Sequence, residues 1–138
     1  MDQIIYKNIR TSNLGFGTSL LTRNNSVKDA MSNLETAFDF GITHFDCAKL
    51  YGFGQADMIL GRFAKNKRHS ITITSKSGLY ARKLPLFTLP LVNSIRKILS
   101  DGRETIVPNE SAPKFGVFDK KKLQSDIDSS LKSMCTDY

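Results

Sequence analysis

The feature that most constrains this chain of 138 residues is a regular alternation of extended and helical patterns in its first half. Short extended segments at 14–20, 43–46 and 70–76 are separated by two segments whose apolar residues recur at helical spacing. Strands and helices that alternate in this way are typical of parallel α/β folds, in which each helix leads back to the next parallel strand. The alternation therefore predicts a parallel sheet with helices packed against it.

Both helical segments carry the one-sided apolar stripe of a helix that packs on a sheet. Ser26 precedes the first, and Asp29 follows three residues later, at the spacing of a capping box. Gly61 lies inside the second, where a glycine costs about 1 kcal/mol relative to alanine, so we expect a close helix contact there. The stripes are Val27, Ala30, Met31, Leu34, Ala37 and Phe38, and then Ala56, Ile59, Leu60, Phe63 and Ala64.

An acid, a phenol and a lysine stand where two neighbouring strands are expected to end. Asp46 closes the second extended segment, Tyr51 follows it beside the glycines of YGFG, and Lys76 closes the third segment. Side-chain alternation puts His44 and Asp46 on one face of their strand. Because α/β folds keep their chemistry in the loops after parallel strands, we expect Asp46, Tyr51 and Lys76 to lie within reach of one another.

Such a trio could donate a proton to a carbonyl oxygen. Tyrosine ordinarily ionises near pH ~10, so a tyrosine that gives up a proton at neutral pH needs its anion stabilised. An ammonium a few ångströms away would favour the phenolate, and an aspartate would keep that ammonium charged and oriented. Asp46 and Tyr51 alone have an alternative explanation, since an aspartate at a strand end is commonly a cap and a tyrosine beside glycines commonly packs.

These residues fall in three sequence blocks that resemble the N-terminal part of an aldo-keto reductase. The blocks are LGFGTS at 14–19, GITHFDCAKLYGFGQADMILGRF at 41–63 and ITSKSG at 73–78. The resemblance implies the N-terminal half of a (β/α)8 barrel, so that residues 1–138 would form one partial barrel domain. It also implies an oxidoreductase that passes a hydride from NADPH, or less often NADH, to a small aldehyde, ketone or sugar, or that catalyses the reverse oxidation.

The resemblance assigns roles to individual residues. Tyr51 would be the proton donor, with Asp46 and Lys76 as its catalytic partners. The residues that would lie near the nicotinamide ribose are Gly17, Thr18, Ser19 and Asp46.

The chain departs from the family pattern in two places. The family usually has Thr or Ser at Cys47, whose side chain should point toward the helix layer, opposite to Asp46. The family's catalytic histidine ends the fourth strand, which would follow Tyr138, and neither His44 nor His69 stands at an equivalent position. Because a (β/α)8 barrel has about 250 residues, we expect this chain to be inactive by itself and to associate, with its own copy or another chain, through an open barrel edge.

Residues 77–118 form a long connection that contains all four prolines. Compact domains seldom contain so long a connection unless it is a functional lid or disordered. Apolar residues within it predict a short helix, either on a membrane surface or, as we favour, covering the barrel mouth. The helix residues are Leu91, Val92, Ile95, Ile98 and Leu99, with Arg96 and Lys97 beside them, and the side chains that could affect substrate choice are Arg82, Lys83 and Phe87.

A last helix is expected over residues 120–134, with Asp119 as its cap. Its spacing predicts an inward apolar face. The residues of that face are Leu123, Ile127, Leu131 and Met134.

Composition excludes several other functions. The net charge is +7, and residues 1–61 hold five basic and six acidic residues, so the excess of basic residues lies after them. These basic residues are scattered and show no nucleic-acid-binding motif, which favours solvated helix faces over a nucleic-acid partner. With no apolar run of ~18 residues and no signal-peptide pattern, we expect no membrane contact and a cytoplasmic location. The two cysteines form no CxxC pair, and a zinc site would need every Cys and His of the chain, so we expect no metal.

Overall fold

The computed structural model describes residues 2–6, 8–23, 25–78, 84–99 and 119–137. Between residues 15 and 74 strands and helices alternate, as predicted. The elements are β1 (Gln3–Tyr6), β2 (Ile9–Ser12), β3 (Gly15–Gly17), α1 (Val27–Asp39), β4 (His44–Asp46), η1 (Tyr51–Gly54), α2 (Gln55–Ala64), η2 (Arg68–Ser70), β5 (Thr72–Thr74), η3 (Leu86–Thr88), α3 (Leu89–Leu99) and α4 (Lys120–Ser133).

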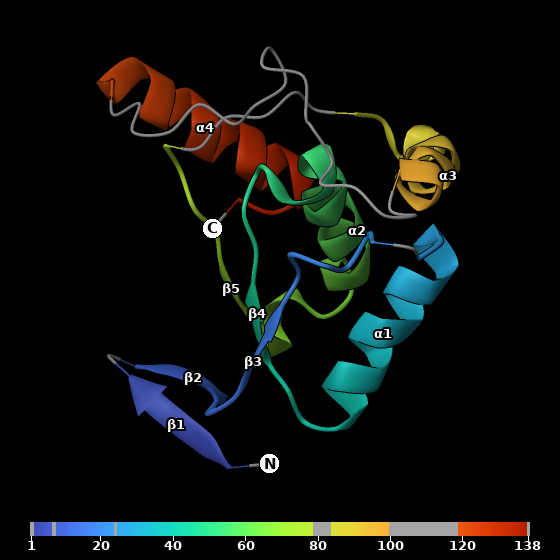
Figure 1. The fold of residues 1–138 in the computed structure, drawn as a ribbon. Coiled ribbons are helices and arrows are strands. Elements are labelled where there is room, and N and C mark those ends of the chain that lie inside the picture. The colour runs from blue at the N-terminus through green and yellow to red at the C-terminus, as the bar shows by residue number, and fades with distance from the viewer. Residues whose placement is uncertain (1, 7, 24, 79–83, 100–118, 138) are drawn as a thin grey trace.

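A three-stranded parallel sheet forms the centre of the structure, in the order β3-β4-β5. The register places Gly17 beside Asp46 and Asp46 beside Thr74, so the carboxyl ends of the strands lie level with one another. β3 ends earlier than its sequence pattern suggested, because the Thr18 carbonyl accepts a hydrogen bond from the Leu21 N–H and the chain turns there. β1 and β2 form a separate antiparallel hairpin at the opposite end of the sheet (Figure 1).

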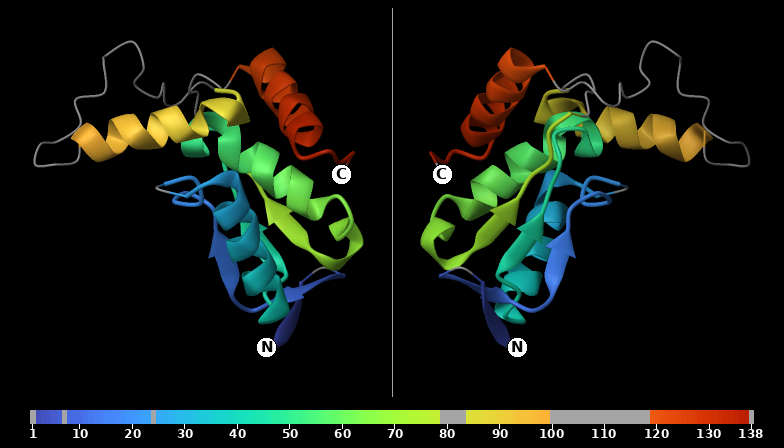
Figure 2. Two further views of the ribbon diagram at one scale, coloured as in Figure 1. Left: turned by 90° about the vertical axis from the view of Figure 1, so that its right-hand side faces the viewer. Right: turned by 90° about the vertical axis from the view of Figure 1, so that its left-hand side faces the viewer.

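Helices α1 and α2 cover one face of this sheet (Figure 2). Phe45 of β4 is fully buried beneath them, with its ring centroid 5.1 Å from that of Phe63 and 6.1 Å from that of Phe16. Among the described residues, no helix lies in front of the other face, which carries the polar side chains of β4 and β5 (Figure 2). The sheet therefore divides the structure into an apolar layer and an open polar face.

The predicted capping box of α1 is confirmed. The Asp29 N–H donates to Ser26 Oγ at 3.1 Å, and the Ser26 N–H donates to Asp29 Oδ2 at 3.0 Å. Ser26 Oγ also donates to Asp29 Oδ2 at 2.7 Å, and this hydrogen bond, together with the one from the Ser26 N–H, holds the pKa of the Asp29 carboxyl below its ordinary value. The box fixes the start of the helix, and with it the length of the loop that leaves β3.

The close contact expected at Gly61 is also confirmed. A Cβ at this position would lie 2.6 Å from Met134 Cα and 2.6 Å from the Ser133 carbonyl oxygen, so α2 and α4 touch backbone to backbone. Asp119 caps α4 as predicted, by accepting a hydrogen bond from the Lys122 N–H.

The predicted inward face of α4 is partly wrong. Met134 is buried, but Ile127 is 49% exposed, and the residues that turn inward beside Met134 are Asp126 and Ser130. Asp126 is ion-paired with Lys49, and Ile127, about 100° further around the helix, lines an open hollow beside β5 instead of lying in the core. A polar contact to a residue far along the chain thus occupies part of the buried side of α4.

The helix predicted inside the long connection is present as α3. Asn93 of α3 donates to the Asn25 carbonyl at 2.9 Å, and Gln55 donates to the Pro85 carbonyl just before η3. α3 thus lies on the helix side of the sheet, above α1 (Figure 1). That it covers the mouth of a barrel stays a prediction. Phe87 is exposed, whereas the predictions for Arg82 and Lys83 lie outside the described residues. None of the described helices is long and apolar enough to cross a membrane.

The Gly61 contact can be tested by replacing Gly61 with alanine. Alanine favours an isolated helix, but its methyl group would collide with the α4 backbone. We expect Gly61→Ala to lower the free energy of unfolding by roughly 1–3 kcal/mol, measured by urea denaturation. Ser32→Ala, on the exposed side of α1, is the matched control and should leave stability unchanged or slightly higher; an unchanged stability of Gly61→Ala would contradict the contact.

Candidate active site

The three residues predicted to be catalytic meet at the carboxyl end of the sheet. Lys76 Nζ donates to both carboxylate oxygens of Asp46, at 2.7 and 2.6 Å. The same ammonium lies 3.2 Å from the Tyr51 hydroxyl and 3.1 Å from the Cys47 carbonyl oxygen. One ammonium group thus joins the acid to the phenol.

Strand register brings these side chains together. Asp46 is the last residue of β4 and pairs with Thr74, the last residue of β5. Lys76 lies two residues beyond Thr74 and so points to the same side of the sheet. Tyr51 opens η1 after a four-residue loop, and its ring centroid lies 5.0 Å from Lys76 Nζ, within the range of a cation–π contact.

The electrostatics of the site keep the lysine charged. Partial burial by itself lowers the pKa of Lys76, but the hydrogen bonds to Asp46 and to Tyr51 raise it by more, so the net pKa lies above its ordinary value. The Lys76 and Asp46 side chains remain 39% and 36% exposed. An ion pair that is this exposed adds little to the stability of the fold. The pair is suited to orienting a proton donor that solvent and small molecules can reach.

An unusual backbone holds Tyr51 at its place. The three residues that follow it, Gly52, Phe53 and Gly54, all have left-handed φ angles, of 58°, 57° and 80°. A Cβ on Gly52 would overlap the Thr22 hydroxyl, so glycine is required there. Phe53 takes the same region without that freedom, a feature that side-chain patterns do not reveal.

The residues expected near a nicotinamide ribose divide into two groups. Gly17 and Ser19 are exposed, and open space surrounds the position of a Cβ on Gly17. Thr18 is fully buried, and its hydroxyl donates to the Asp46 carbonyl oxygen at 3.0 Å. Thr18 therefore ties β3 to β4, a contact that the sequence did not predict, while its neighbours face outward.

The histidines lie away from the trio. His44 is on the polar face one layer below Asp46, with Nδ1 2.9 Å from Thr72 Oγ1 and Nε2 3.4 Å from Thr74 Oγ1. His69 belongs to η2 before β5, at the amino end of that strand. Within the described ranges, no cluster of His, Cys, Asp or Glu could hold a metal ion.

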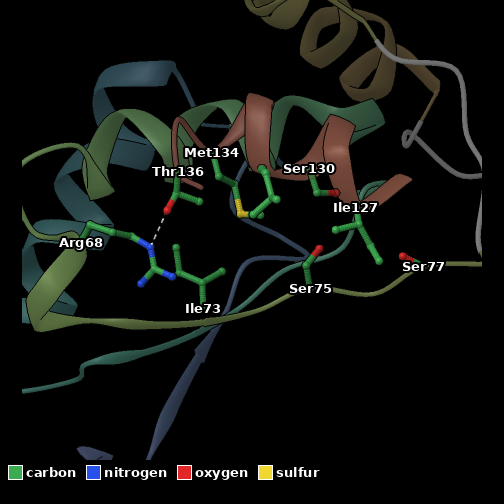
Figure 3. Close-up of a pocket in the computed structure, with 9 residues that line it drawn as sticks. Arg68, Ile73, Ser75, Ser77, Ile127, Ser130, Met134 and Thr136 are labelled. Carbon is green, nitrogen blue, oxygen red and sulfur yellow. Dashed lines mark hydrogen bonds between the residues drawn. The ribbon is translucent and has the colours of Figure 1, made fainter. Parts of the chain in front are cut away.

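A hollow of about 190 Å³ lies between β5 and α4. Figure 3 shows its side chains facing one another across the gap between the strand and the helix, with Arg68 Nε donating to Thr136 Oγ1 at 3.0 Å. The hollow is lined by Arg68, Ile73, Ser75, Ser77, Ile127, Ser130, Leu131, Met134 and Thr136.

Comparison with known sequences identifies one family. A sequence model of the aldo/keto reductase family matches residues 13–138. The aldo-keto reductase YhdN of Bacillus subtilis is 32% identical over 85 residues, which are 57% of this chain and 26% of that protein. An uncharacterized oxidoreductase of the same organism, YqkF, is 38% identical over 68 residues, 49% of this chain and 21% of that protein.

Solved structures agree on the fold. The holo form of the aldo-keto reductase AKR11C1 from Bacillus halodurans superimposes with a TM-score of 0.67 at 21% identity, over all of this chain and 38% of that one. A putative aldo-keto reductase from Pseudomonas aeruginosa gives 0.65 at 23% identity, over 94% of this chain and 39% of that one. The chain thus spans under half of these structures, and the predicted N-terminal half of a (β/α)8 barrel is confirmed.

The buried thiol of Cys47, the residue after Asp46, should make the stability of the fold depend on pH. Burial and then the nearby carboxylate of Asp57, which accepts from Cys47 Sγ at 2.9 Å, strongly raise the pKa of Cys47. The thiol of the unfolded chain ionises near pH ~8.5, whereas the folded thiol has a raised pKa, so the stabilisation is complete below pH ~8.5 and declines above it. We expect the free energy of unfolding to fall by about 1.4 kcal/mol per pH unit above pH ~8.5 from this group, measured by urea denaturation.

Cys47→Ser is the control for this pH dependence, because serine keeps a donor for Asp57 and does not ionise. The difference in stability between wild type and Cys47→Ser should narrow or reverse as the pH rises. In the native protein iodoacetamide should alkylate the exposed Cys135 and spare Cys47. A stability difference between wild type and Cys47→Ser that stays constant with pH, together with rapid alkylation of Cys47, would show that the Cys47 thiol is accessible to solvent.

Proposed function

Since this chain belongs to the aldo/keto reductase family, we propose that it supplies the proton-donating side of an NADPH-dependent reductase of aldehydes or ketones. The observation that carries the proposal is the Lys76 ammonium, which bridges the Asp46 carboxylate and the Tyr51 hydroxyl. The chain spans only part of its relatives, so the proposal concerns the reaction in which these residues take part.

Tyr51 is the acid of this reaction. A carbonyl oxygen next to its hydroxyl accepts the phenolic proton as a hydride reaches the carbonyl carbon, and an alcohol and a phenolate result. Lys76, held 3.2 Å away, stabilises the phenolate, while Asp46 keeps the ammonium aimed at it. Because the side chains of Lys76 and Asp46 are partly exposed, solvent can return the proton to Tyr51. In the reverse direction the phenolate removes the proton of an alcohol or a sugar hydroxyl.

The polar face also suits a nicotinamide cofactor, which when bound would supply the hydride. Gly17 leaves room for a flat ring at the end of β3, and the exposed Ser19 offers a hydroxyl beside it. Asp46 has lone pairs beyond those used by Lys76, with which it can accept from a ribose hydroxyl. Thr18 contributes through the backbone, since its side chain is buried against Asp46. NADH would serve the same chemistry.

Replacing Tyr51 by phenylalanine tests the role of the hydroxyl. In a version of the chain extended to a full barrel and assayed by NADPH oxidation against a panel of aldehydes, ketones and sugars, Tyr51→Phe should lower turnover roughly 10²–10⁴-fold, the usual contribution of a general acid. The affinity for NADPH should change little, because the ring remains. Ser77→Ala, one residue beyond Lys76 and exposed, should leave both quantities unchanged. Full turnover in Tyr51→Phe would remove Tyr51 from the acid role.

A second candidate function is association without catalysis, and the hollow between β5 and α4 favours it (Figure 3). In the part of the chain that the structure describes, no strand pairs with the outer edge of β5. A strand from another barrel segment added there would place side chains against Ile73 and the exposed Ile127. A stable dimer in sedimentation that Ile127→Asp dissociates, with no NADPH binding, would favour this function over the reductase.

A further inference from the structure

A buried ion pair connects the loop of the trio to a distant helix. Lys49, midway between Asp46 and Tyr51, donates to Asp126 Oδ1 of α4 at 2.8 Å, across 77 positions of sequence. Their side chains are only 12% and 7% exposed, so the pair is far more enclosed than that of Lys76 and Asp46. A pair so enclosed is hard to break, because removing one partner leaves the other charge buried without it.

This pair is one of two anchors on the loop. On the inner side, Cys47 donates to Asp57 of α2 and its N–H donates to the Thr74 carbonyl. On the outer side, Lys49 reaches α4. Tyr51 is attached to the same short stretch, because its N–H donates to the Ala48 carbonyl at 2.9 Å.

Helix α4, which carries Asp126, is itself held in place by other contacts. Its end presses on α2 at Gly61, where a Cβ would meet backbone atoms at 2.6 Å. The segment after it is held by the hydrogen bond from Arg68 to Thr136. α4 is therefore fixed independently of Lys49, and Asp126 transmits that fixed position to the loop.

The tyrosine contact is sensitive to any movement of the loop. At 3.2 Å, the distance between Lys76 Nζ and the Tyr51 hydroxyl is at the long end of the hydrogen-bonding range. A shift of a few tenths of an ångström would break that bond, whereas the pair between Lys76 and Asp46 would persist at 2.6 Å. The alignment of the phenol thus depends on what holds residues 47–50.

We propose that Asp126 is a positioning residue for the Tyr51 hydroxyl, which it aligns with Lys76 by holding Lys49 and the loop between Asp46 and Tyr51. The inference rests on the proposed function of Tyr51 as an acid, and it adds a residue of α4, outside the strand ends, to the machinery of the reaction. Asp126 acts through Lys49 and touches neither substrate nor cofactor.

A spectroscopic test needs no turnover. Tyrosine labelled with ¹³C at Cζ gives one signal for each of the four tyrosines of the chain, and the Tyr51 signal is assigned by its loss in Tyr51→Phe. Lys76→Met should move this signal, since it removes the contacting ammonium. Asp126→Asn should move it in the same direction by at least half as much. Glu35→Gln is the matched control, because it breaks the ion pair with Lys67 far from the loop and should leave the signal in place.

The outcomes separate the two proposals. A Tyr51 signal that Lys76→Met moves and a folded Asp126→Asn does not would overturn the positioning role and leave the proposed acid intact. A signal that even Lys76→Met leaves in place would overturn both. A displaced signal in Asp126→Asn, with full turnover in Tyr51→Phe, would support positioning and remove the acid role.

Rescue distinguishes positioning from general destabilisation. The reversed pair Lys49→Asp/Asp126→Lys should restore the Tyr51 signal that Asp126→Asn displaces. If Asp126→Asn does not fold, the double variant Lys49→Met/Asp126→Leu removes both charges and avoids an unpaired one; it should fold with the signal displaced, and an unmoved signal would overturn the proposal. In the active protein, Asp126→Asn should lower kcat by roughly tenfold, as small misalignments of catalytic groups do, with the KM for NADPH nearly unchanged.

Discussion

The structure depends on the parallel register of β4 with its two neighbours. Phe45 of β4 points into the helix layer, and the flanking His44 and Asp46 point to the other face. A slip of one residue would bury a carboxylate among Phe16 and Phe63 and expose the central ring. Burial of one aromatic side chain therefore fixes the face on which the acid appears, and the apolar core and the chemistry are specified together.

Much of the site could be predicted from sequence because it is built from short-range features. Alternation along two strands and the meeting of their carboxyl ends suffice to bring Asp46 and Lys76 together, and Tyr51 follows within one short loop. The rest depends on contacts that no local pattern encodes. Asp126 is buried on α4 against Lys49, a partner 77 positions away, and Phe53 has a left-handed backbone that apolar periodicity cannot signal. α3 was expected as a helix, but its place above α1 is set by hydrogen bonds to distant loops.

Three lysines show how environment assigns different roles to one side chain. Lys67 pairs with Glu35 and lies over the Phe63 ring at 5.0 Å, so it covers the end of the core. Lys49 is enclosed and links a loop to a helix. Lys76 is partly exposed to solvent, and its ammonium donates hydrogen bonds to a carboxylate, a backbone carbonyl and a phenol hydroxyl. Only the last combination keeps a charge available to a small molecule, so exposure separates a cation that can assist chemistry from one that supports the fold.

During synthesis on the ribosome, the two partners of the ion pair between Lys49 and Asp126 are made at different times. The residues of β3, β4, β5, α1 and α2 have all been synthesised once Lys76 has left the ribosome. Asp126 appears 77 residues after Lys49, which at ordinary translation speeds is a wait of roughly 4–15 s. During that interval the nascent loop carries the Lys49 ammonium without the Asp126 carboxylate, so Asp46, Tyr51 and Lys76 have been synthesised before the helix that holds their loop.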